Sequence, residues 1–184
     1  NPERLMKPTD LSYEDFQAML LLFQEESDRG AAVLAGSYLE SSLGTFLESK
    51  LVDKTLAKKL LGSSGALCTF EQRIDVAQAF GFLNPNLCSM LSFIRKIRNH
   101  FAHHPKEASF AADPVRNWVR GLISFRPLTE TKGSPYTPDD GKGIYLFTVA
   151  LVYGAMIAST QGQSPAVEEF FKFALNRGVA REGV

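Results

Sequence analysis

The chain has 184 residues, of which 45% are hydrophobic and 22% are charged. This length suits one domain with a substantial core rather than two. Twenty basic residues balance twenty acidic ones, so binding to nucleic acid or to an anionic membrane would require a local patch of charge. The two cysteines are too few for a disulfide framework and lack metal-ligand spacing. They favour reduced thiols in a cytoplasmic protein.

The first half of the chain carries helix signals throughout. Residues 1–8 are polar, and we expect them to be flexible. A first helix should follow a cap at Thr9 or Asp10, and Ser27 should cap a second helix that runs to Leu51. Small residues line one side of this second helix, which we therefore place at the centre of a bundle. They are Ala31, Ala32, Ala35, Gly36, Ser37, Ser41, Ser42 and Gly44.

Three charged residues of the second helix are candidates for structural ion pairs. Glu40 lies within the small-residue surface and is either a partly exposed charge or the buried partner of an arginine, such as Arg29 or Arg98. Asp28 is the second candidate partner for Arg98. The pattern alone leaves these alternatives open.

The following helices have local start and stop signals. These signals are Asp53 and Gly62, the capping box of Thr69 and Gln72 with Gly81, Asn84 with Pro85, Asp113 with Pro114, and Ser164 with Pro165. Residues 126–143 hold three prolines and three glycines and should form a long surface loop. The uncharged run from Ile144 to Ser159 is shorter than a bilayer span of about 20 residues, so we predict a buried helix and no membrane segment.

No segment alternates between polar and apolar residues, so no strand is predicted. The sequence therefore predicts an all-α fold, with residues 1–184 forming a single-domain bundle of about seven helices.

The helix that begins at Pro85 ends in a cationic cluster. An apolar stripe runs along it, and all three histidines of the chain lie at its end. Any site is expected here, as a binding patch. Its candidate residues are Arg95, Lys96, Arg98, His103 and His104.

Within this cluster, Arg98-Asn99-x-x-x-His103 resembles the Arg-(polar)-x-x-x-His motif of HEPN-domain proteins, helical bundles that include metal-independent ribonucleases. The resemblance implies that Arg98 would neutralise phosphate while His103 would transfer protons. It also implies a homodimer, because two chains complete the site. On one helix Arg98 and His103 lie about 140° apart, whereas Asn99 and His103 share a face. The alternative is that Arg98 forms a salt bridge in the bundle and His103 and His104 interact with the helix C-terminus.

Two further kinds of site are less favoured. Ala77, Gly81 and Leu87 have the spacing of a helix-turn-helix, but the second helix would open with few side chains that reach base edges, so direct nucleic-acid binding is not favoured. His100 and His104 are four residues apart but lack acidic partners nearby, so no metal site is expected. No phosphate loop is present, and we expect no cofactor.

Four blocks of sequence resemble the mannitol operon repressor (MltR-like) family. They are 26–32 (ESDRGAA), 65–82 (GALCTFEQRIDVAQAFGF), 94–103 (IRKIRNHFAH) and 113–116 (DPVR). The resemblance covers roughly residues 23–122 and implies an all-α regulator of transcription without enzymatic activity. It also implies binding to other proteins, because the family lacks an obvious DNA-binding module. A phosphotransferase-system carrier would suit such a regulator as partner.

Three hypotheses for the cationic cluster follow. In an interaction module, Arg95 and Arg98 would bind carboxylate or phosphate of a partner. In a ribonuclease, Arg98 and His103 would both be required for cleavage. In a purely structural role, Arg98 would pair inside the bundle and its loss would unfold the protein.

Overall fold

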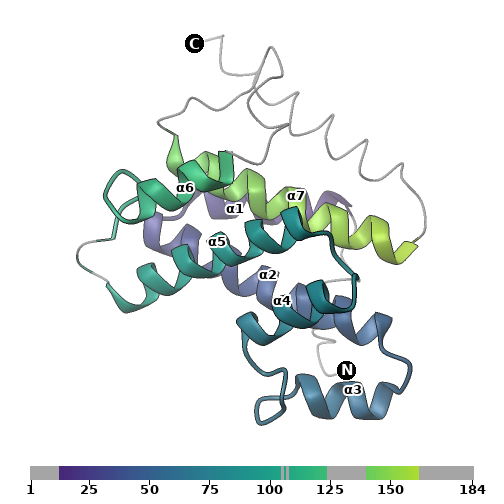
Figure 1. The fold of residues 1–184 in the computed structure, drawn as a ribbon. Coiled ribbons are helices and arrows are strands. Elements are labelled where there is room, and N and C mark those ends of the chain that lie inside the picture. Colours follow the sequence, from purple (N-terminus) through teal and green to yellow (C-terminus); the bar gives the residue numbers. More distant parts are fainter. Residues whose placement is uncertain (1–12, 105, 107, 124–139, 162–184) are drawn as a thin grey trace, which may run out of the picture.

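The computed structural model describes residues 13–104, 106, 108–123 and 140–161. These residues form seven helices and no strand, which confirms the predicted all-α bundle (Figure 1). The helices are α1 (Tyr13–Glu25), α2 (Asp28–Lys50), α3 (Lys54–Leu61), α4 (Phe70–Ala79), α5 (Pro85–His103), α6 (Val115–Ile123) and α7 (Gly141–Gln161). The predicted flexible residues 1–8, the cap at Thr9 or Asp10 and the helix after Ser164 lie outside the described residues.

Helix α2 is the centre of the bundle, as its small residues predicted. It packs against α1, α3, α4, α5 and α7, and most of its small residues are buried. Ser37 and Ser41 are exceptions, because both are exposed. The close-packed surface is therefore narrower than the sequence suggested.

Local capping chemistry sets where several helices begin and end. The side chains of Ser27, Asn84 and Thr69 accept backbone N–H bonds at the starts of α2, α5 and α4, and Thr69 and Gln72 complete the capping box. Gly81, at φ 67°, ends α4: its N–H bonds to the Gln78 carbonyl while the next N–H bonds to Ala77. This pairing is a Schellman motif, which requires the left-handed backbone that glycine adopts easily.

Lysines from distant parts of the chain cover carbonyls at the ends of other helices. Lys142 Nζ donates to the carbonyls of Gln24 and Glu26 at the end of α1. Lys50 Nζ donates to the Ser159 carbonyl of α7 at 2.7 Å. A cation at a helix C-terminus is favourable because the unpaired carbonyls there are partly negative. These two lysines therefore have a structural role, because their ammonium groups are bonded to backbone carbonyls.

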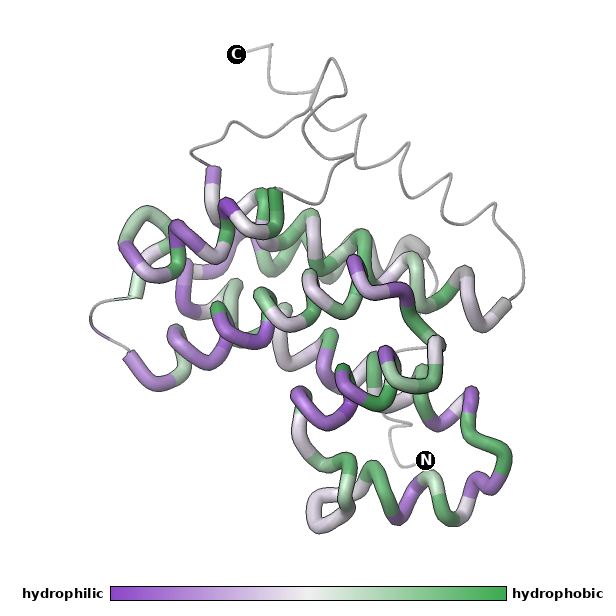
Figure 2. Tube along the Cα trace, viewed as in Figure 1, coloured by the Kyte–Doolittle hydropathy of each residue, from purple (hydrophilic) through white to green (hydrophobic). Residues whose placement is uncertain are grey.

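Helix α7 begins at Gly141, inside the segment 126–143 that the sequence assigned to a surface loop. Asp140 explains the earlier start, because its carboxylate accepts the Gly143 N–H at 2.8 Å and its carbonyl accepts the Ile144 N–H. The rest of that segment, 126–139, lies outside the described residues. Figure 2 shows apolar residues along most of α7, and much of the helix is buried in the core. None of the described helices is long and apolar enough to span a bilayer.

Candidate functional site

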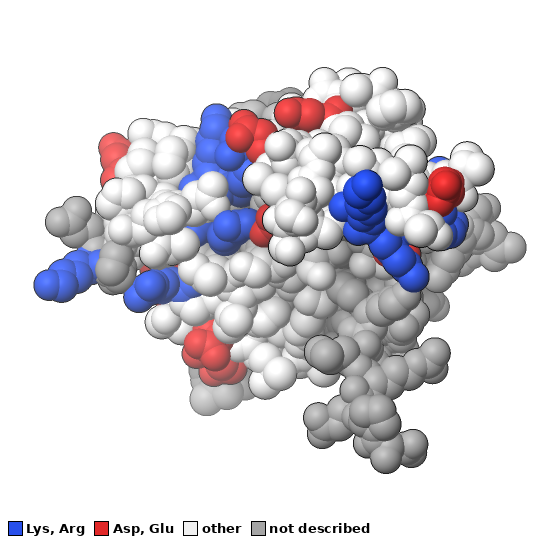
Figure 3. Space-filling model, turned by 90° about the horizontal axis from the view of Figure 1, so that it is seen from below, with Lys and Arg blue, Asp and Glu red and all other residues white. Residues whose placement is uncertain are grey.

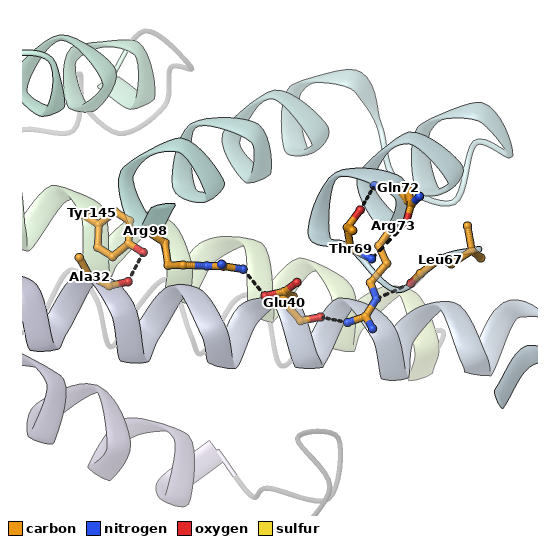
Figure 4. Close-up of polar contacts among 8 residues, drawn as sticks. All are labelled: Ala32, Glu40, Leu67, Thr69, Gln72, Arg73, Arg98 and Tyr145. Atoms are coloured by element: carbon orange, nitrogen blue, oxygen red, sulfur yellow. Dashed lines mark hydrogen bonds and ion pairs between the residues drawn. The ribbon is translucent and has the colours of Figure 1, made fainter. Parts of the chain in front are cut away.

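Arg98 on α5 lies in a junction formed by α2, α4 and α5. Its Nη2 donates to the Glu40 carboxylate of α2 (Figure 4), and its guanidinium carbon lies 5.7 Å from the centre of the Phe70 ring at the start of α4. The two charged side chains are only 20% and 23% exposed. Of the partners considered for Arg98, the structure places Glu40 against it.

The other two candidates for structural ion pairs lie elsewhere. One oxygen of the Asp28 carboxylate accepts the Phe110 backbone N–H at 3.2 Å, which fastens the segment before α6 to the start of α2. Arg29 is exposed, and no ion pair joins it to Glu40 within the described residues. Asp28 therefore stabilises the segment before α6, and Glu40 forms the ion pair with α5.

Arg73 on α4 completes the junction, and the sequence analysis did not identify it. Its Nε donates to the Leu67 carbonyl at 3.0 Å and its Nη1 to the Glu40 carbonyl at 3.1 Å (Figure 4). Its Nη2 donates to the Leu61 carbonyl at 3.0 Å. A Cβ at Gly44 would lie 3.1 Å from Nη1. Gly36 and Gly44 lie eight residues apart on α2 and face Arg98 and Arg73, respectively. Their spacing was the sequence signal that two side chains could approach the α2 backbone closely.

Arg95, one turn before Arg98, also turns toward α4. Its Nη2 lies 3.0 Å from Oε1 of Glu71, a carboxylate that is 61% exposed. This pair is therefore partly solvated and contributes less to stability than a buried one. Both arginines of the predicted binding patch are neutralised by glutamates of neighbouring helices.

The three histidines lie at the C-terminal end of α5, beyond the two arginines. His103 and His104 are exposed. The His104 Nδ1 lies 3.1 Å from the His100 carbonyl, where it donates and caps the helix. The His100 and His104 rings stack with centroids 4.3 Å apart. The Trp118 ring on α6 is nearly perpendicular to the His100 ring, with 5.6 Å between the two centroids. His104 is thus held in place by its own helix and by a neighbouring ring.

The structure does not bring Arg98 and His103 together within one chain. Arg98 reaches along α2 to Glu40, and His103 is exposed to solvent. Asn99, the remaining residue of the motif, is half-buried. Among the described residues, no hydrogen bond or ion pair links the arginine to the histidine. The helix geometry that predicted their separation is preserved.

Two buried ionisable groups of the core, Tyr145 and Cys88, keep their protons. Burial raises the pKa of Tyr145 well above its usual value of about 10, and its hydroxyl donates to the Ala32 carbonyl at 2.8 Å (Figure 4). Burial, and to a smaller extent the nearby Asp75 charge, raises the pKa of the Cys88 thiol. Neither group is activated for nucleophilic chemistry, because a raised pKa keeps the proton in place.

The described part of the chain contains a small cavity but no cluster of metal ligands. A cavity of about 10 Å³ lies between α2 and α7, lined by Ser42, Phe46, Tyr153, Met156, Ile157 and Thr160. That volume holds about one water molecule. No group of three His, Cys, Asp or Glu side chains in the described ranges is placed to hold a metal ion.

Comparisons of the chain with protein-family models, with curated proteins and with solved structures give no match.

Proposed function

We propose that this chain is a non-enzymatic regulatory protein of the repressor type, as the resemblance to the MltR-like family implies, and that it acts by binding another protein. The observation that carries the proposal is the engagement of Arg98 with Glu40. An arginine that must neutralise a substrate phosphate would have to leave that carboxylate. Opening the pair would leave a half-buried charge without a partner, at a cost of roughly 1–3 kcal/mol.

The remaining cations support the same reading. Arg95 is paired with Glu71, and Arg73 is fixed on three carbonyls. Three arginines that could serve phosphate chemistry thus hold helices together. Lys96, His103 and His104 are exposed at the surface of α5. This position suits contact with a partner protein better than cleavage of RNA in an enclosed site. An anionic partner fits this surface in charge, and a phosphotransferase-system carrier is the partner that the resemblance suggests.

The first experiment asks whether the protein cleaves RNA. Purified protein is incubated with mixed single-stranded RNA without metal, beside the His103→Ala variant, whose exposed side chain can be removed without affecting the core. The proposal predicts no cleavage by either protein, with both shown to be folded by circular dichroism. Cleavage by the wild type that the His103→Ala variant lacks would replace the proposal with the ribonuclease alternative.

A second experiment addresses regulation directly. In cells that lack the gene, transcript levels of at least one uptake operon should change. Re-expression of the wild type should restore them fully and that of His103→Ala at least in part, because the proposal makes His103 one binding contact among several and gives it no catalytic role. Restoration by the wild type alone would contradict that assignment.

A further inference from the structure

The surface at the C-terminal end of α5 is basic, and no acidic side chain among the described residues pairs with it. It consists of Lys96, His103, His104 and Lys106, all of which are exposed; we call it the basic end surface. Within the described residues none of the four makes an ion pair, and α5 itself carries no Asp or Glu along its whole length. Figure 3 shows Lys and Arg gathered in parts of one face of the molecule, with acidic groups beside some of them.

We propose that the basic end surface binds a segment rich in Asp and Glu on a partner protein. This inference rests on the proposed function and adds to it the location of the contact and the chemistry of the partner. Lys96 and His103 are seven residues apart, which is two helical turns or about 10 Å along the axis. An extended segment of three or four residues spans that length.

The chemistry of the available groups favours carboxylates over phosphates. Arginine forks are the side chains best suited to bidentate phosphate recognition, but Arg95 and Arg98 each bond a glutamate, Glu71 and Glu40, through Nη2. The exposed groups are lysine ammonium ions and imidazoles, which interact with dispersed carboxylates as point charges and single donors. The surface thus matches an acidic segment in charge without offering a phosphate clamp.

Local contacts shape this surface for binding. The carbonyls at a helix C-terminus disfavour an anion, and the His104 ring covers one of them by bonding to the His100 carbonyl. The Lys96 ammonium lies 5.5 Å from the centre of the Phe93 ring, a cation–π distance that reduces its freedom before binding. Both contacts lower the cost of bringing a negatively charged chain to this end of α5.

The test uses a fluorescently labelled deca-glutamate peptide and the purified full chain, with binding followed by anisotropy at low salt. The double variant Lys96→Gln/Lys106→Gln should bind the peptide about threefold to tenfold more weakly than the wild type. The matched control is Lys58→Gln/Lys59→Gln, which removes the same charge from exposed positions on α3. This control should bind as the wild type does, and thermal melts should show that both variants are folded.

Three results would overturn the inference. The first is that the wild type does not bind the peptide, and the second is that both double variants bind it equally weakly. The third is that the wild type prefers a phosphoserine peptide or an oligouridylate and binds it through Lys96 and Lys106. A failure of the proposed function gives a different result, because RNA cleavage by the wild type would refute that proposal whatever the peptide does.

Discussion

Gly36 on α2 faces the side-chain stem of Arg98 on α5 and the hydroxyl of Tyr145 on α7. A Cβ at position 36 would lie 2.7 Å from Arg98 Cβ and 2.8 Å from Tyr145 Oη, both closer than atoms in contact can approach. One missing methyl group therefore lets α5 and α7 meet at the same point of α2. One helical turn further along α2, Glu40 receives the guanidinium of the same arginine.

Replacing this glycine should loosen the contact among the three helices. Gly36→Ala adds a methyl group where there is no space, and overpacking of this kind costs roughly 1–3 kcal/mol, reduced by the better helix propensity of alanine. We expect a net loss of up to about 2 kcal/mol in the free energy of unfolding, measured in urea.

The control for this substitution is the next position. Ser37 is exposed on α2, so Ser37→Ala changes helix propensity without adding a contact and should leave stability within about 0.5 kcal/mol of the wild type. A Gly36→Ala protein as stable as Ser37→Ala would show that α2, α5 and α7 are packed less tightly than described.

Arg73 should be one of the most sensitive charged positions in the chain. Arg73→Met removes donors from three carbonyls in three segments, which should cost about 2–4 kcal/mol because the hydrogen bonds of a charged group are strong. Arg73→Lys should recover less than half of that loss, since an ammonium lacks the planar fork. Arg29→Met at an exposed site is the reference; an equal, small effect of both methionine variants would contradict a structural role for Arg73.

Tyr145 should make the protein less stable in alkali. Burial raises its pKa in the folded state, whereas an unfolded tyrosine ionises near pH 10. Above about pH 10 the unfolded chain therefore holds fewer protons than the folded chain, and stability falls as the pH rises. At pH 8 Tyr145→Phe should be less stable by about 1 kcal/mol through the lost bond to the Ala32 carbonyl.

The difference between these two proteins should shrink above pH 10, because the phenylalanine variant lacks the ionising group. The measurement is urea unfolding of both proteins at pH 8 and at about pH 11. A constant difference between them would mean that the Tyr145 hydroxyl reaches solvent in the folded state.

Several helix boundaries were predictable because local capping bonds set them. The Asn84 side chain accepts the Leu87 N–H, and Thr69 and Gln72 bond to each other. Because these bonds span three residues, their roles are visible in the sequence. The start of α7 was missed because Asp140 was read as part of a glycine- and proline-rich loop. Its capping bond to the Gly143 N–H outweighs that composition.

Contacts between distant helices were less predictable. Glu40 was one of two acidic residues considered for Arg98, and charge alone could not choose between Glu40 and Asp28. The choice depends on Gly36, which admits the arginine stem one turn before Glu40. Arg73 was not foreseen because its partners are backbone carbonyls, which every residue carries. Their arrangement follows from how α2, α3 and α4 pack, and not from any local pattern.

The most direct test of the account is a double-mutant cycle on Arg98 and Glu40. Arg98→Met and Glu40→Gln are made singly and together, and the free energy of unfolding of each is measured in urea. We predict that each single variant loses about 1–3 kcal/mol and that the double variant loses less than the sum by about 1 kcal/mol or more. Single variants as stable as the wild type, with no coupling between them, would show that Arg98 is free to serve a binding or catalytic site and would contradict the account.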